Sequence, residues 1–195
     1  KAYDADELEN PLTLGLIKNG GNELAGPGMI DLDYLLGTNG GHMNVNGAAG
    51  RGTKSSFLLF ANWMLLREAN KQQQERPSDL NRLRIVPIIF NVKNFDLFHI
   101  DSWSKRYNTE KHLSDWQAIG VDEPEPFQNV TFYAAQTAGQ VAIATSRRRN
   151  DVIPFSWSLS DIIEGGLFSY LFTEMDANDH NFGGIVLDIE GLLTH

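Results

Sequence analysis

The sequence predicts an α/β fold in which a mostly parallel sheet is flanked by helices. Three observations support this prediction. An apolar strand leads through a glycine-rich turn into a long apolar helix near residue 50, and further apolar strands follow at 84–91 and 130–135. Strands that alternate with helices at such spacing favour parallel pairing. Ahead of them, residues 1–40 are rich in strand and turn signals and predict a short β-rich N-terminal extension.

Within this extension, a short strand is expected at 12–17 and a turn at 19–22. Residues 29–36 have the pattern of a strand that runs into a helical turn. The segment carries too few apolar side chains for a core of its own. We therefore expect it to be the end of a preceding element and to pack onto a second domain that spans 41–195.

The second domain is expected to begin with a core strand at 42–46 and a long helix at 54–71. The early part of this helix is apolar on most sides, which suits burial against a sheet. The apolar run at 84–91 is nearly continuous, as is typical of a strand covered on both faces by helices. A third strand is expected at 130–135 and a fourth at 140–145.

Towards the C-terminal end, an amphipathic helix is expected to begin near Ser158 or Ser160 and to continue through Phe172. Asp161 falls in its first turn, where a carboxylate interacts favourably with the helix dipole. Residues 183–188 are apolar and fit the start of either another strand or another helix.

Composition excludes several classes of function. The net charge of −9 creates no general attraction for nucleic acid, so DNA contact would need a local basic patch or a partner. The chain has no cysteine, which excludes disulfides and thiolate metal sites, and no two of its five histidines have the i, i+4 spacing of a helical zinc site. Without a long apolar run or a secretory signal, we expect a cytoplasmic protein with no membrane partner.

The turn near residue 50 has the layout of a phosphate-binding loop. Glycines let backbone N–H groups turn inward around phosphate oxygens, and the helix N-terminus adds partial positive charge. A lysine neutralises the terminal phosphates, and a hydroxyl group binds Mg²⁺. The sequence therefore predicts an ATP site with Mg²⁺, in which Ser55 is the metal ligand and Ser56 its alternative. The predicted nucleotide contacts are Gly47, Gly50, Arg51, Gly52, Thr53, Lys54, Ser55 and Ser56.

The spacing of this loop differs from the usual G-x-x-x-x-G-K-[ST] pattern, in which the lysine follows the first glycine by six positions. Here Gly47 and Lys54 are seven positions apart. In one alignment the loop carries one extra residue, and in the other Ala48 and Thr53 occupy the glycine positions. Thr53 is β-branched and poorly suited to a positive φ, so we favour the extra residue.

Two stretches together resemble a known family. Residues 42–56 resemble the Walker A region of HerA-type ATPases, relatives of the FtsK DNA translocases, and 88–101 are similar to that family's second-strand motif. Residues 15–17 and 29–32 also look like the exit from the family's small β-barrel. The resemblance covers about residues 12–101. It implies a RecA-like P-loop NTPase fold and a ring-shaped, hexameric homo-oligomer that uses ATP to translocate or unwind DNA, often beside a nuclease.

The chain departs from this family at positions that matter for hydrolysis. Asn91 stands where the family usually has aspartate, and Phe95 stands where its glutamate would position water. The neighbouring Asp96 is the candidate that could orient water instead, and Lys93 is the candidate sensor of the γ-phosphate. We name both as the expected catalytic residues. The run at 185–190 resembles a Walker B strand but fits a loop better.

Two functions from different classes therefore stay open. In the first, the chain is an ATPase of the HerA/FtsK kind, and the arginine run 147–149 supplies an arginine finger to a neighbouring subunit. In the second, it is a degenerate nucleotide-binding or structural assembly module with little or no hydrolysis. Since no Walker B strand is evident and the chain stops at His195 after an apolar run, we expect an ATPase core that is incomplete at its C-terminus.

Overall fold

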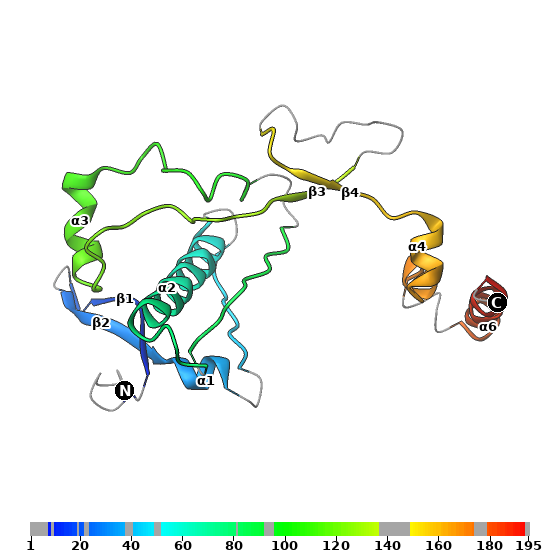
Figure 1. The fold of residues 1–195 in the computed structure, drawn as a ribbon, viewed down its shortest axis with the longest axis horizontal. Coiled ribbons are helices and arrows are strands. Elements are labelled where there is room, and N and C mark those ends of the chain that lie inside the picture. Colours follow the sequence, from blue (N-terminus) through cyan, green and yellow to red (C-terminus); the bar gives the residue numbers. More distant parts are fainter. Residues whose placement is uncertain are drawn as a thin grey trace. The chain divides into compact units, whose positions relative to one another are not determined.

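A computed structural model describes residues 8, 10–18, 20–21, 24–37, 41–48, 52–80, 82–91, 96–136, 149–173 and 179–193. The chain forms two compact units, the first from Lys1 to Asn129 and the second from Val130 to His195 (Figure 1).

The first unit begins with an antiparallel hairpin. Strand β1 (Pro11–Lys18) pairs with β2 (Leu24–Asp31), with Leu12 opposite Ile30. Helix α1 (Leu32–Leu36) follows β2 directly. The side chain of Asp31 caps it by accepting a hydrogen bond of 2.9 Å from the backbone N–H of Asp33, which is the usual role of aspartate at a helix start.

Two longer helices complete the first unit. Helix α2 (Thr53–Glu75) lies beside β1 (Figure 1). Helix α3 (Thr109–Gln117) is capped by Asn108, whose side-chain oxygen accepts a 3.0 Å hydrogen bond from the backbone N–H of Lys111. The turn after α3 is tied back to α2, because Arg67 donates to the carbonyl of Gly120 at 2.8 Å.

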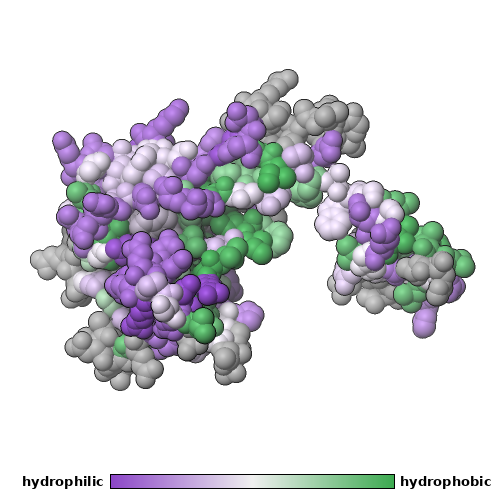
Figure 2. All heavy atoms as spheres, in the orientation of Figure 1, coloured by the Kyte–Doolittle hydropathy of each residue, from purple (hydrophilic) through white to green (hydrophobic). Residues whose placement is uncertain are grey.

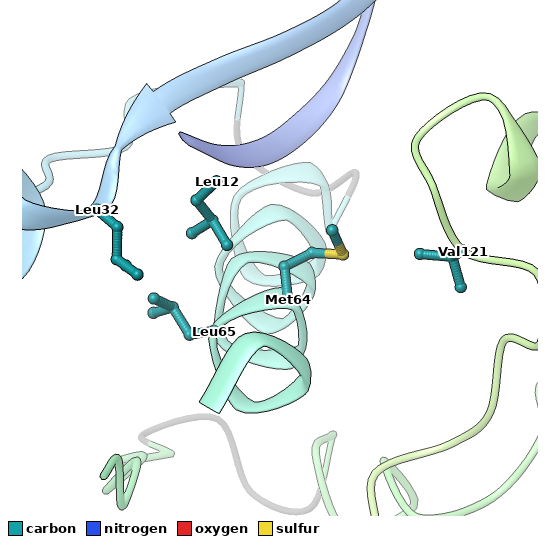
Figure 3. Packing of buried hydrophobic residues seen from close by; sticks show 5 residues of the cluster. All are labelled: Leu12, Leu32, Met64, Leu65 and Val121. Atoms are coloured by element: carbon teal, nitrogen blue, oxygen red, sulfur yellow. The ribbon is translucent and has the colours of Figure 1, made fainter. Parts of the chain in front are cut away.

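The core of the first unit is built around α2. Leu12 and Leu32 from the hairpin region pack near Leu65, while Met64 points toward Val121 from the turn after α3 (Figure 3). Val121 is the most completely buried of these side chains, with 1% of its surface exposed. Helix α2 therefore links the N-terminal hairpin to the segment around α3 in one hydrophobic cluster.

The second unit begins with two short strands. Strand β3 (Tyr133–Ala135) pairs in parallel with β4 (Ile153–Phe155). They are followed by α4 (Leu159–Glu164), the 3₁₀ helix η2 (Phe168–Leu171) and α6 (His180–Leu193). The contact between η2 and α6 includes Phe172, whose ring meets those of Phe168 and Phe182 edge-on at centroid distances of 5.5 and 5.3 Å.

The predicted RecA-like P-loop fold with a mostly parallel sheet is wrong. The described residues form two separate two-stranded sheets, and only β3–β4 is parallel. Residues 42–46 and 84–91, expected to be core strands, join no sheet. The third expected strand is reduced to the short β3, and the fourth, at 140–145, lies outside the described residues.

The physical reason is clearest at 84–91. The apolar run predicts a strand covered on both faces, but the pattern of apolar residues does not determine whether other elements cover those faces. Val86 and Phe90 are 85% and 88% exposed, so no described helix covers that side of the segment. Figure 2 shows that apolar side chains reach the surface in several places. A buried parallel sheet requires helices on both faces, and here only one side of the run is partly covered, where Ile85 packs against the cluster that contains Met64 and Leu65.

The helices were predicted more successfully than the strands. The helix expected at 54–71 is confirmed and extends to Glu75. The helix expected from Ser158 begins as predicted but ends at Glu164, where Gly165 and Gly166 interrupt it. Gly166 adopts a left-handed φ of 63°, a conformation that favours glycine and does not continue a helix. The run at 183–188 lies within α6 and is helical.

Candidate phosphate-binding site

At the start of α2, backbone donors have no hydrogen-bond partner among the described residues. Gly52 is its N-cap, with a left-handed φ of 67°, and no side chain caps the helix. The first helical hydrogen bond runs from the N–H of Ser56 to the carbonyl of Gly52 at 2.9 Å. The N–H groups of Thr53, Lys54 and Ser55 precede it and have no carbonyl partner within the helix. Together with the helix dipole, these groups favour an anion.

Lys54 reaches back over the turn that precedes its own helix. Its Nζ donates a hydrogen bond of 2.7 Å to the carbonyl oxygen of Gly47. A Cβ atom on Gly47 would lie 3.3 Å from Cγ of Lys54 and 3.7 Å from Oγ1 of Thr53. Glycine at 47 therefore lets the backbone lie against the lysine stem. This contact brings together two of the predicted site residues from the two ends of the loop.

The positive φ of this turn falls on Gly52 and not on Thr53, which takes the first helical position. A β-branched residue in a left-handed conformation would cost about 1–2 kcal/mol more than glycine. Ser55 and Ser56 lie in the first turn of α2 with exposed side chains. Gly50 and Arg51, which were also predicted to contact the nucleotide, lie outside the described residues.

The structure does not bring the predicted catalytic residues to this loop. Lys93 lies outside the described residues, and Asp96 is exposed at the start of a turn at 96–101. Within the described residues, Asp96 has no hydrogen bond or ion pair with Lys54. Arg149, the described member of the predicted arginine finger, donates to Asp151 through Nε at 2.8 Å.

The residues present fit a Mg²⁺ ion that arrives with a nucleotide. Among the described residues no group of three histidine or acidic side chains is placed to hold a metal. Mg²⁺ does not require such a group, since it usually takes one or two protein ligands together with waters and substrate phosphates. The exposed hydroxyl of Ser55, next to the uncapped helix start, is a suitable single ligand.

The first unit has a second feature that was not predicted from the sequence. A cleft that is open to the surface, with a volume of about 450 Å³ and called the cavity below, is lined by residues of β1, α2, α3 and the loop before α3, including Phe60, Tyr107, His112 and Trp116. The sequence signal was the density of aromatic and charged residues at 103–116. That density gave no indication of a cavity, because Phe60 is brought to this segment only by tertiary packing.

No protein-family model, no curated protein and no solved structure matches the chain. Within the described residues, no helix has the length and apolar character needed to cross a membrane. The function is therefore inferred from the geometry of this chain and from the local resemblance of its loop.

Proposed function

We propose that the turn before α2 and the first turn of that helix bind the phosphates of ATP. The observation that carries this proposal is the position of Lys54, whose ammonium group lies over Gly47 at 2.7 Å beside an uncapped helix N-terminus. A lysine ammonium has three N–H donors. The contact with Gly47 uses one of them, and within the part of the chain that the structure describes the other two are left for phosphate oxygens.

Each side chain has a distinct part in this proposal. Lys54 would neutralise the terminal phosphates, and the backbone N–H groups of the first turn would donate to their oxygens. Ser55 would contribute its hydroxyl to the coordination of Mg²⁺, which supplies charge neutralisation between the β- and γ-phosphates when bound. Gly47 and Gly52 would shape the turn, the first by leaving room for Lys54 and the second by its left-handed φ.

The resemblance of residues 12–101 to HerA/FtsK-type ATPases supports a broader proposal. ATP binding would serve a subunit of a ring-shaped homo-oligomer that moves or unwinds DNA, with a nuclease as a neighbouring partner. The net charge of −9 means that DNA contact in such a ring would depend on local basic residues or on a partner.

A specific observation favours the alternative, a nucleotide-binding or assembly module with little or no hydrolysis. Asp96 is exposed at a turn and has no described contact with the loop. Catalysis of hydrolysis needs a group that positions the attacking water. The described part of the chain does not place such a group beside Lys54, so binding is better supported than turnover.

The test compares phosphate ligands on residues 1–195. With Mg²⁺ present, ATP and inorganic tripolyphosphate should both bind, and AMP should bind at least tenfold more weakly than ATP in calorimetric titrations. AMP binding as tight as ATP binding would refute the phosphate site. Release of inorganic phosphate, measured in the same samples, separates an ATPase from a module that only binds.

A further inference from the structure

The cavity of about 450 Å³ in the first unit has aromatic walls. Phe60 projects from α2, Trp116 and His112 from α3, and Tyr107 from the loop before α3. Its volume lies within the range of about 300–1,000 Å³ that is usual for small-molecule sites. Such sites are mostly apolar and carry a few polar groups that fix the orientation of the ligand.

The aromatic walls are held by contacts with other rings. Trp116 meets Phe60 at a centroid distance of 5.9 Å and Trp63 at 5.4 Å. Both partners pack against the hydrophobic core, which fixes Trp116 in place. On the other wall, Tyr107 lies 5.6 Å from His112 with only 31° between the ring planes. Tyr107 also meets Trp103 at a centroid distance of 4.3 Å with 32° between the ring planes, so tilted ring contacts hold this wall as well.

The tautomer of His112 follows from its backbone contact. The N–H of Asn108 donates to Nδ1 of His112 at 3.1 Å. An accepting Nδ1 carries no proton, so the neutral ring has its proton on Nε2. The side chain of Asn108 also caps α3. The residue that begins the helix therefore also holds the imidazole ring of His112 in place.

Two charged side chains of opposite sign line the same cavity. Arg106 provides only donors, and Asp115 provides only acceptors. Within the described residues, neither side chain forms a hydrogen bond or an ion pair. Over 103–116 the three basic residues are offset by two acidic ones. The site therefore suits a ligand with both donors and acceptors on its edge.

We propose that this cavity binds a planar heteroaromatic ring of the nucleobase class. The ring stacks on the aromatic walls, and its polar edge meets Arg106 and Asp115. The base can belong to the nucleotide whose phosphates the loop holds or to a separate nucleoside. Only the first of these sources rests on the proposed function, because the residues that line the cavity are not those of the phosphate loop.

The experiment uses residues 1–195 and adenosine, which has a base but no phosphate, with ribose as the ligand control. We expect adenosine to shift the NMR signals of residues 104–116 and ribose to leave them unchanged. Tyr107→Leu should weaken adenosine binding about tenfold, the scale of one lost base–aromatic stack. The matched control Tyr170→Leu removes a tyrosine that is 81% exposed in η2 and should not change the affinity.

A second variant keeps the proposal testable if Tyr107→Leu does not fold. Asp115→Leu alters an exposed side chain and should also weaken adenosine binding about tenfold, since it removes a charged hydrogen-bond acceptor. No adenosine binding at millimolar concentration, or an affinity that both variants leave unchanged, would overturn the proposal.

The two sources of the base are separated with inorganic tripolyphosphate and ATP. If the base and the phosphates of one nucleotide use both sites, ATP should bind more tightly than adenosine or tripolyphosphate and should displace both. If the base is a separate ligand, ATP should bind no more tightly than tripolyphosphate, because one molecule cannot use both sites. Both results support the cavity. If adenosine binds and tripolyphosphate does not, the phosphate proposal is refuted. If tripolyphosphate binds and adenosine does not, the cavity proposal is refuted.

Discussion

The ammonium group of Lys54 and the carbonyl oxygen of Gly47 are joined by a hydrogen bond of 2.7 Å that spans the two ends of the candidate phosphate loop. In this arrangement the backbone carbonyl occupies one donor of the lysine and holds its side chain over the turn. A phosphate oxygen is a stronger partner for the ammonium because it carries negative charge. The lysine is thus already placed beside the helix start before an anion arrives.

Replacing this lysine should weaken ATP binding. We expect Lys54→Ala to lower the affinity at least tenfold, or about 1.4 kcal/mol, because a charge-assisted contact is lost. Calorimetric titration with ATP and Mg²⁺ measures the change. Lys71→Ala, on the exposed later part of the same helix, is the control and should bind like the unchanged chain. An unchanged affinity in the folded Lys54 variant would refute the loop assignment.

Hydrolysis should depend on Asp96 if this carboxylate orients the attacking water. In the proposed homo-oligomer, Asp96→Asn should reduce turnover by about 100- to 1,000-fold, the scale of a positioned general base, while ATP affinity stays nearly constant. Steady-state phosphate release measures turnover. Asp122→Asn changes another exposed aspartate and should have no effect. Full turnover in the Asp96 variant would remove this residue from the mechanism.

Residues 1–195 alone are expected to hydrolyse ATP slowly. The loop lacks a described water-positioning partner, so this segment should bind ATP more readily than it hydrolyses it. Rapid phosphate release by residues 1–195 as a monomer would contradict that expectation.

Stability of the first unit should depend on the side chains between α2 and the turn after α3. Met64 is 5% exposed and points toward Val121. Met64→Ala should lower the free energy of unfolding by about 2–5 kcal/mol, because it removes buried surface and leaves a cavity. Leu80→Ala is the control, since Leu80 is 86% exposed and its loss should change stability by about 0.5 kcal/mol or less. Urea unfolding measures both, and equal effects would contradict the assigned core.

Acid should destabilise the start of α4. The Ser158 hydroxyl donates to Oδ2 of Asp161 at 2.7 Å, and the Ser158 N–H donates to the same oxygen at 2.8 Å; these bonds hold the pKa of Asp161 below its usual value. Since the pKa is lower in the folded state than the unfolded value of about 3.9, the stabilisation is complete above that pH and is lost as the pH falls through the lowered value.

Backbone NMR shifts of α4 during an acid titration provide the measurement. We expect helical shifts at neutral pH and their loss as the pH falls through the lowered pKa of the Asp161 carboxyl group. In Asp161→Asn this transition should disappear. Glu164→Gln, at the other end of the same helix, should retain it. An acid transition that persists in the Asp161 variant would show that another group controls the helix.

The features that were predicted correctly from the sequence are local in origin. The starts of α2 after Gly52 and of α4 near Ser158, with Asp161 in its first turn, depend on neighbouring residues, so the pattern alone indicated both. The apolar run at 84–91 shows the opposite case, because strand pairing depends on partners that are distant in the sequence. Its apolar residues predicted burial, yet Ile88 is 76% exposed.

The candidate sites divide in the same way. The contact of Lys54 with Gly47 joins residues seven positions apart, and the loop pattern predicted both as nucleotide contacts. The aromatic cavity joins Phe60 to Trp116 across 56 positions, since 116 − 60 = 56. No short sequence motif specifies a contact between residues so far apart in the chain. It results from the packing of α3 against α2, which periodicity does not specify.

The distribution of the four tryptophans has a spectroscopic consequence. Trp63 and Trp116 lie edge to face at 5.4 Å and pack against the core of the first unit. Trp157 is the sole tryptophan of the second unit and is 61% exposed, so its emission already resembles that of an indole in water. A red shift of the tryptophan fluorescence spectrum on unfolding will therefore report the first unit. Unfolding of the second unit will change that spectrum very little.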